Sequence, residues 1–127
     1  MFETVLGPYS VALEAREAQL SVIAGNIANA DTPHYQAQSI DFEAAMSRAD
    51  ASAPLRMTTT HSGHLDPTAH GRFNVEYQRP STGSADGNTV DIHRETTEHA
   101  KAVTGYNLAL ELLQGSSQGL RKAIKGQ

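Results

Sequence analysis

The chain has 127 residues, no cysteine and a formal net charge of −4, from 10 basic and 14 acidic side chains. This length fits a single domain. The acidic balance argues against a nucleic-acid-binding protein, which needs basic side chains against phosphates, and the lack of cysteine excludes disulfides and thiolate nucleophiles. The hydrophobic share of 39% predicts a small core. No stretch resembles a membrane span of about 18 apolar residues or a cleaved secretory signal.

The first predicted element is a long amphipathic helix from about Thr4 to Ala30. Its apolar residues recur at alternating steps of three and four, which is the heptad pattern of a helix that packs against another helix. Pro33 biases the preceding residue towards an extended backbone, so the helix should end near residues 29–31. The predicted packing positions of this helix are Leu6, Tyr9, Leu13, Leu20, Ile23 and Ile27.

The middle of the chain has no long periodic segment. Asp41 predicts the start of a short helix, because an aspartate can accept hydrogen bonds from the first free N–H groups of a helix. Gly, Pro, Ser and Thr are frequent over residues 51–88, which is typical of loops. Alternation of apolar and polar residues over Leu55–Thr58 and Phe73–Tyr77 predicts two short strands of a hairpin.

A second heptad pattern begins near Asp91 and predicts a long C-terminal helix. Asp91 and Glu95 place negative charge near the positive end of the helix dipole, so they are expected to anchor its start. Basic side chains gather near the other end, where cations suit the dipole. The predicted packing positions of this helix are Val103, Tyr106, Leu110, Leu113, Leu120 and Ile124.

These elements predict a mainly α fold: two long terminal helices packed as an antiparallel coiled-coil-like hairpin, with a loop-rich or weakly β middle segment. The predicted parts are an N-terminal helix with its exit over residues 1–35, the middle segment over 36–88, and the C-terminal helix over 89–127. Each long helix has one apolar face and little else in the chain to cover it. Because helices depend on tertiary packing, we expect the fold to need contacts with other chains.

One histidine cluster, His61, His64 and His70, could bind zinc or nickel. The spacing is not that of two ligands on one helix turn, and no carboxylate is placed to act as a base. Ser62 lies beside these histidines but lacks the turn of a nucleophile elbow. We therefore predict no metal, cofactor or catalytic site. A small periplasmic metal-binding or hydrolytic protein that uses this cluster remains the alternative, and a regulatory or chaperone-like helical hairpin is a third possibility.

The most informative segment, residues 26–35, reads Asn-Ile-Ala-Asn-Ala-Asp-Thr-Pro-His-Tyr. Its two asparagines are three residues apart, so they share a helix face and can bond to backbone groups at the helix end or to another chain. At the end of a long N-terminal helix, this segment resembles the signature of flagellar basal body rod proteins. Residues 36–43, 88–95 and 120–126 resemble the proximal rod members of that family. Gly is common in the family where His34 stands and Lys is frequent at position 36, so His34 would have to form with a Cβ a turn that favours Gly.

The resemblance implies a structural subunit and not an enzyme. Such a subunit assembles through its terminal helices into the tubular drive shaft of the flagellum, which transmits torque and encloses the export channel. The resemblance also implies passage through the flagellar type III export apparatus without a cleaved signal peptide, and a place in the periplasmic rod of the basal body.

The partners implied by the resemblance are other rod subunits, copies of the same chain, the rod-base adaptor protein, the MS ring and the export gate. Nucleic acid, membrane insertion and cofactors are not expected. The motif residues should fix the exit from the first helix and touch adjacent subunits; they are Asn26, Asn29, Thr32, Pro33 and Tyr35.

Overall fold

The computed structural model describes residues 2–50, 73–80 and 84–126. Along the chain the elements are α1 (Phe2–Ala28), β1 (Gln38–Ile40), α2 (Phe42–Asp50), β2 (Val75–Tyr77) and α3 (Ile92–Lys125). The protein is therefore mainly helical, and its N- and C-terminal helices pack together, as the heptad patterns predict.

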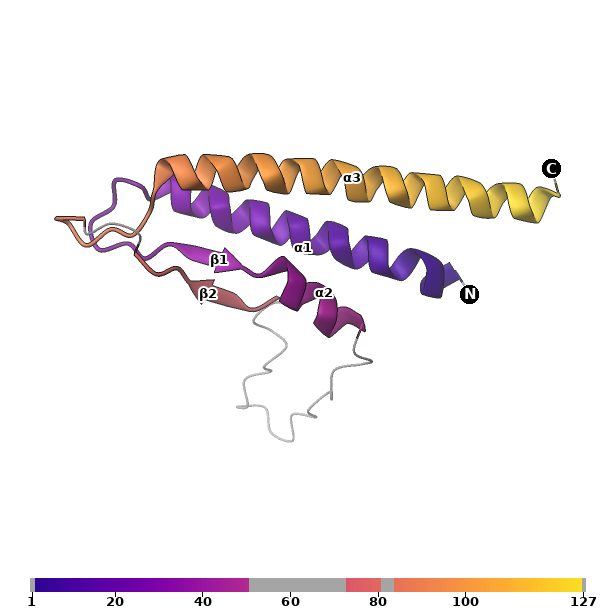
Figure 1. Cartoon of the computed structure of the whole chain (residues 1–127), viewed down its shortest axis with the longest axis horizontal. Helices are drawn as coiled ribbons and strands as arrows, with labels where there is room; N and C mark the ends of the chain where they lie inside the picture. Colours follow the sequence, from indigo (N-terminus) through magenta and orange to yellow (C-terminus); the bar gives the residue numbers. More distant parts are fainter. Residues whose placement is uncertain (1, 51–72, 81–83, 127) are drawn as a thin grey trace, which may run out of the picture.

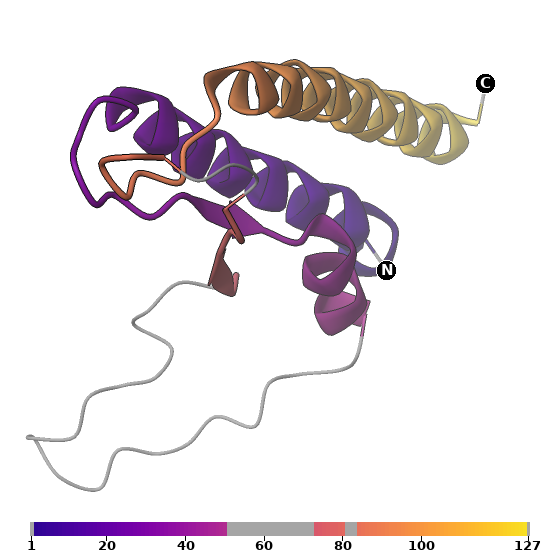
Figure 2. The same cartoon turned by 60° about the vertical axis from the view of Figure 1, so that its left-hand side comes forward.

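Helix α1 lies in the middle of the molecule. Helix α3 runs along one side of it, and the two short strands and α2 lie on another side (Figure 1). The start of α1 and the end of α3 lie at the same end of the molecule, and α3 continues beyond the start of α1 in both views (Figures 1 and 2). The loops after α1 and before α3 meet at the opposite end. No helix in the described part of the chain is long and apolar enough to cross a membrane.

Local hydrogen bonds and backbone conformations determine where the long helices begin and end. Helix α1 ends at Ala28, close to the predicted end. Helix α3 starts at its N-cap Asp91, whose Oδ1 accepts hydrogen bonds from the backbone N–H groups of His93 at 3.0 Å and Arg94 at 3.3 Å. It ends at Gly126, which has a φ of 68° and donates its N–H to the Lys122 carbonyl. A left-handed residue of this kind is a common helix end, and glycine adopts it without strain.

The two strands form an antiparallel pair in which Ser39 lies opposite Glu76. The strand predicted over Phe73–Tyr77 is confirmed for its last three residues. Its partner in the described chain is β1, whereas the partner predicted for it, Leu55–Thr58, lies outside the described residues. Helix α2 follows β1 directly, and Asp41 accepts from the N–H groups of Glu43 and Ala44 at its start, so the predicted short helix is confirmed.

The core is small and consists largely of alanine. Its buried apolar residues are Val11, Ala15, Ile23, Ala37, Ile40, Ala45, Ala102 and Ala109. Small side chains let α1 and α3 approach closely, and a Cβ atom added at Gly105 would lie only 2.7 Å from Nε of Arg16.

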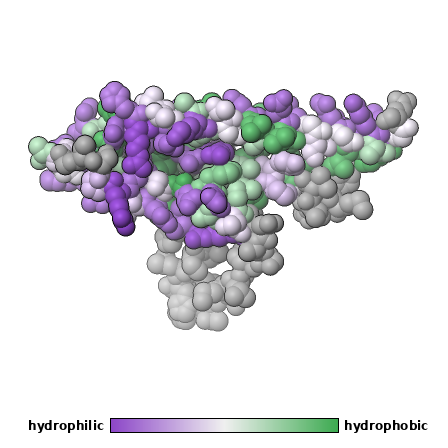
Figure 3. Space-filling model, viewed as in Figure 1, coloured by the Kyte–Doolittle hydropathy of each residue, from purple (hydrophilic) through white to green (hydrophobic). Residues whose placement is uncertain are grey.

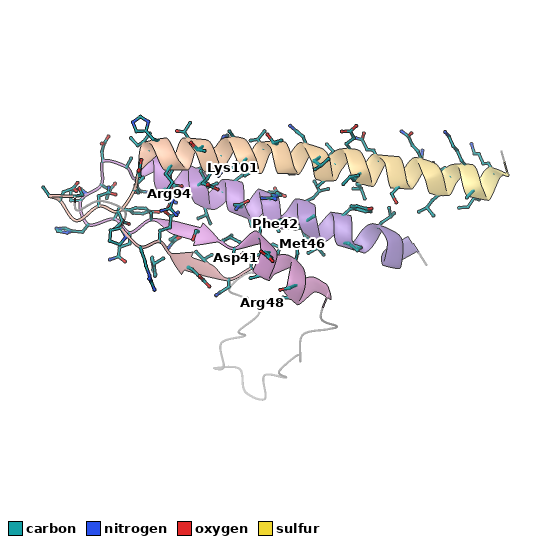
Figure 4. The ribbon with its side chains drawn as sticks, in the orientation of Figure 1. Asp41, Phe42, Met46, Arg48, Arg94 and Lys101 are labelled. Carbon is teal, nitrogen blue, oxygen red and sulfur yellow. The ribbon has the colours of Figure 1, made fainter. Side chains whose placement is uncertain are left out.

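Arg16 fills the space between the three helices. Its guanidinium lies 3.6 Å from the centre of the Phe42 ring and donates to Oε1 of Gln19 at 2.9 Å. Figure 4 shows Phe42 at the start of α2, on the side facing α1. Burial lowers the pKa of the Arg16 guanidinium, and the aromatic face offers it a cation–π contact in exchange for water. Arg16 stands at a heptad position between Leu13 and Leu20, and this contact explains how a charged residue is accommodated in an otherwise apolar line.

Candidate subunit-packing site

Asn26, the first asparagine of the motif, is fully buried where α1 meets β1 and α3. Its Nδ2 donates to the Gln38 carbonyl at 2.7 Å and to Oε2 of Glu95 at 2.9 Å. Its Oδ1 accepts from the Gln38 N–H at 2.9 Å. One side chain thus joins the last full turn of α1 to β1 and to the first turn of α3.

Glu95 is fully buried beside Asn26. Its second oxygen, Oε1, accepts from Nε2 of Gln78 at 3.0 Å, and the same amide donates to the Gln38 carbonyl. The sequence indicated only a favourable charge near the helix dipole. It held no sign of this pairing, because Glu95 and Asn26 are 69 positions apart.

The exit from α1 is closed by Asn88, a buried residue whose role was not predicted from the sequence. Its Nδ2 lies 2.8 to 3.0 Å from three backbone carbonyls, those of Asn29, Ala30 and Thr32. Asn29 itself donates to the Gly25 carbonyl at 2.8 Å, and Thr32 Oγ1 donates to Oδ1 of Asn29 at 3.2 Å. The side-chain amides of Asn29 and Asn88 therefore donate to backbone carbonyl groups at and just after the end of α1, where a helix leaves such groups free.

His34 adopts a positive φ of 59°, a backbone conformation that glycine adopts easily and that a residue with a Cβ rarely adopts. Its N–H donates to the Asp86 carbonyl at 3.0 Å. Opposite it, Gly87 has a φ of 75°, and a Cβ at that position would lie 2.8 Å from Nδ1 of His34. Glycine at 87 is therefore favoured for two reasons: its own positive φ, and the space that the His34 ring occupies.

Asp86 organises the loop beside His34. The Ser84 hydroxyl and the Asn88 N–H donate to its carboxylate and hold the pKa of Asp86 below the ordinary value of 3.8, with a smaller contribution from the charge of His34.

Of the remaining motif residues, Tyr35 is half-buried, and Thr32 and Pro33 are exposed. The Tyr35 carbonyl accepts the Thr89 N–H at 3.0 Å, and Thr89 Oγ1 accepts the Ala37 N–H at 2.7 Å. The chain leaving α1 is therefore tied to the chain entering α3, and this arrangement leaves Thr32 and Pro33 on the surface.

Most of the apolar heptad positions of α1 do not lie on the most buried face of the helix. Leu13 is two residues from the buried Ala15, which at about 100° per residue places the two on nearly opposite sides of the helix. Residues at the same heptad position as Leu13 share its side. Of the predicted positions, Ile23 is buried, Ile27 is 38% exposed, and the half-buried ones are Leu6, Tyr9, Leu13 and Leu20.

On α3 the most buried positions, Glu95, Ala102 and Ala109, likewise differ from the predicted ones. Ile124 is 70% exposed, and the other predicted positions are half-buried: Val103, Tyr106, Leu110, Leu113 and Leu120. Two residues outside the prediction, Leu108 and Leu112, are 56% and 48% exposed. Figure 3 shows hydrophobic surface along α3. The single chain therefore leaves much apolar surface on its long helices uncovered.

The candidate metal ligands His61, His64 and His70, together with Ser62, lie outside the described residues. Within residues 2–50, 73–80 and 84–126, no three His, Asp or Glu side chains are grouped so as to hold a metal ion.

Comparison with known proteins identifies the family. The family described as "Flagella basal body rod protein" matches residues 10–36. A flagellar basal body rod protein FlgB from Cereibacter sphaeroides is 41% identical over 127 residues, which cover 99% of this chain and 98% of that protein. The FlgB proteins of Escherichia coli K12 and Aeromonas hydrophila are 36% and 32% identical, over 90% and 99% of this chain and 88% and 96% of their own lengths. Because this similarity covers nearly the whole chain, including the motif and both terminal helices, the chain belongs to the flagellar basal body rod proteins and is FlgB-like.

Proposed function

We propose that this protein is a subunit of the proximal rod, in which its terminal helices pack with those of neighbouring subunits into a tubular shaft that transmits torque and encloses the export channel. The relatives named as rod proteins support a structural rod subunit. The role proposed is structural, without catalysis or a cofactor. In the described residues, the buried polar side-chain atoms hydrogen-bond to other groups of the chain and so serve the fold.

The observation that carries the proposal is the apolar surface left on α3. Leu108, Leu112 and Ile124 are each about half exposed or more, although large apolar side chains gain roughly 1.5–3 kcal/mol when fully buried. Neighbouring helices would supply that burial. We further propose that α1 and α3 form an antiparallel coiled-coil-like pair, which is supported by the Asn26–Glu95 and Arg16–Gly105 contacts.

In this proposal residues 1–35 and 89–127 are the assembling parts, and 36–88 form the middle segment. Among the motif residues, Thr32 and Pro33 are free to touch an adjacent subunit because they are exposed, whereas Asn26, Asn29 and Tyr35 shape the exit from α1. Asp91 and Glu95 hold the start of α3. Helix packing, within the chain for the buried Ile23 and with neighbouring subunits for the more exposed positions, is assigned to the heptad positions of both helices: Leu6, Tyr9, Leu13, Leu20, Ile23, Ile27, Val103, Tyr106, Leu110, Leu113, Leu120 and Ile124.

The proposed place of the protein is the periplasmic rod, which it reaches through the flagellar export apparatus without a cleaved signal peptide. Its proposed partners are other rod subunits, further copies of itself, the rod-base adaptor protein, the MS ring and the export gate. Support comes from the family and from the exposed helix surfaces.

The test is Leu110→Asp, which places a charge within the apolar line of α3. We expect cells with this variant to be non-motile and the chain to be absent from purified basal bodies. Gln114→Asp, one turn later at an exposed position, adds the same charge and should leave both readouts unchanged. Circular dichroism of both purified variants separates loss of assembly from loss of helix. Normal motility with Leu110→Asp would contradict the packing assignment.

A further inference from the structure

The last residues of α3, Leu120–Lys125, are called the α3 tip below. Asn26 lies beside Glu95 and Arg16 beside Gly105. Since both helices rise equally per residue, Phe2 comes level with about Gly119. The α3 tip therefore extends past the start of α1, as Figures 1 and 2 show, and Ile124 is 70% exposed there.

The α3 tip is also strongly basic. Arg121, Lys122 and Lys125 are all exposed, and the structure gives none of them an ion pair within the described residues. With Gln118 they line a pocket of about 320 Å³. Cations suit the negative end of a helix dipole, but the dipole does not account for an exposed isoleucine beside them.

The rest of the chain carries the opposite charge. The tip holds three of the chain's 10 basic side chains, so the remainder has 7 basic and 14 acidic residues and a formal charge of −7. A body of that charge is complementary to the tip of another copy of the same chain. This favours a second copy as the partner.

One face of α1, formed by Leu13, Glu17 and Leu20 and called its outer face below, carries an acidic side chain and apolar side chains that complement the basic and apolar α3 tip. Glu17 is exposed there and has no ion pair within the described residues. Leu13 and Leu20, one turn to either side of it, are only half-buried. At helical spacing these three side chains share one face.

We propose that the α3 tip of one copy docks on the outer face of α1 of a second copy. Ile124 packs against Leu13 and Leu20, and Arg121 and Lys125 lie around Glu17. A tip cannot reach its own Glu17, which lies about 20 Å along α1 from the helix start. The contact is therefore head-to-tail and repeats from copy to copy instead of closing a two-fold dimer. This inference rests on the proposed function and names the surfaces that meet.

Disulfide trapping tests the contact directly, because the chain has no cysteine of its own. Basal bodies carrying Leu20→Cys together with Ile124→Cys are oxidised and separated on a non-reducing gel. We expect dimers and longer linked species. The matched control pairs Ile124→Cys with Thr97→Cys, an exposed position on α3, and should give monomer only. Equal linking of both pairs, or linking of neither, would overturn the proposal.

Charge reversal gives a second test that does not depend on cysteines. Arg121→Glu should reduce the chain's incorporation into basal bodies about two- to fivefold, as expected for loss of one surface ion pair. Adding Glu17→Arg should restore it, while Glu111→Arg, which makes the same change of charge at an exposed position of α3, should not. Failure of this rescue overturns the docking contact and leaves the proposed function standing if the wild-type chain is present in basal bodies. Absence of the wild-type chain from basal bodies overturns the proposed function itself.

Discussion

At the scale of single residues, the most informative pair is Asn26 and Glu95. Both side chains are fully buried, and no buried side-chain nitrogen or oxygen in the described chain lacks a hydrogen-bond partner. Two neutral amides, from Asn26 and Gln78, donate to the carboxylate. Burying a carboxylate is costly, and the hydrogen bonds that it accepts here reduce that cost. We interpret the pair as fixing how α1 and α3 lie along each other, since any shift would leave these polar groups without partners.

Glu95→Gln tests this interpretation. Both carboxylate oxygens accept hydrogen bonds from NH₂ groups, so the new amide nitrogen would face a donor and leave a buried polar contact unmade. We expect the variant to lose about 1–3 kcal/mol of unfolding free energy, measured by urea denaturation. Glu98→Gln is the control, because the one ion pair of Glu98 within the described residues is a surface pair with Lys101, and losing it should cost less than about 0.5 kcal/mol. Equal effects of the two substitutions would show that the buried pair has no special role.

Asp86 predicts a pH dependence at the loop end. Its pKa in the folded chain lies below the ordinary value of 3.8, because the Ser84 hydroxyl and the Asn88 N–H stabilise the charged form. The contribution of Asp86 to stability is therefore complete above about pH 4 and is lost as the pH falls through the lowered pKa. Asp86→Asn should lower the melting temperature at pH 7, and its difference from the wild type should shrink below pH 3.8. A difference that stays constant from about pH 7 to about pH 3 would contradict this assignment.

At the scale of the elements, the sequence predicted the helices well and their contacts poorly. A heptad pattern over more than twenty residues identifies a helix. Asp91 marks the start of α3, and Pro33 lies shortly after the end of α1. The packing of the two helices against each other was predicted, but the residues between them were not, because the pattern is set by large apolar residues, whereas the close approach uses Ala102, Gly105 and Ala109. Small residues permit close approach but leave no signal of their own in hydrophobic periodicity.

The strand pairing and the buried polar network escaped prediction for a related reason. Alternation along Phe73–Tyr77 indicates a strand but says nothing about its partner, and β1 is only three residues long. The motif at Asn26 and Asn29 was singled out from the sequence, and Glu95 was named only as an acidic residue at the start of the C-terminal helix. The pairing of Asn26 with Glu95 and the role of Asn88 were not predicted, because these partners lie more than fifty positions from the motif and are brought close only by the fold.

Glycines in α3 give a prediction for this element. At Gly115 a Cβ atom would meet nothing within 4 Å, whereas at Gly105 it would meet Arg16. Because glycine in an exposed helix costs about 1 kcal/mol relative to alanine, Gly115→Ala should stabilise the isolated chain by roughly that amount. Gly105→Leu should destabilise it by displacing Arg16 from Phe42 and separating the helices. Thermal melting followed by circular dichroism measures both. Stabilisation by Gly105→Leu would contradict the close helix contact.

At the scale of the whole molecule, packing is uneven along the long axis. Most of α3, up to about Gly119, has α1 beside it, and the Asn26–Glu95 network joins the two helices near the start of α3 (Figures 1 and 2). The strands and α2 support this part of the molecule through their contacts with α1. Towards its end, α3 has no described helix alongside. Stability should therefore fall from the loop end of the molecule towards the chain ends, and the exposed end of α3 should be stabilised when other subunits cover it.

Amide hydrogen exchange can measure this gradient along α3. In the isolated chain, the amides of residues 99–109 should exchange slowly, because the helix there is held by Glu95, Ala102 and Ala109 against α1. The amides of residues 120–125 should exchange much faster, since Ile124 is already 70% exposed and local opening there exposes less further apolar surface. Assembly into basal bodies should slow exchange mainly in this second group, because the α3 tip then has a neighbour. Uniformly slow exchange along the whole of α3 in the dilute chain would mean that the helix is stable without partners, and the need for neighbouring subunits would then have no physical basis.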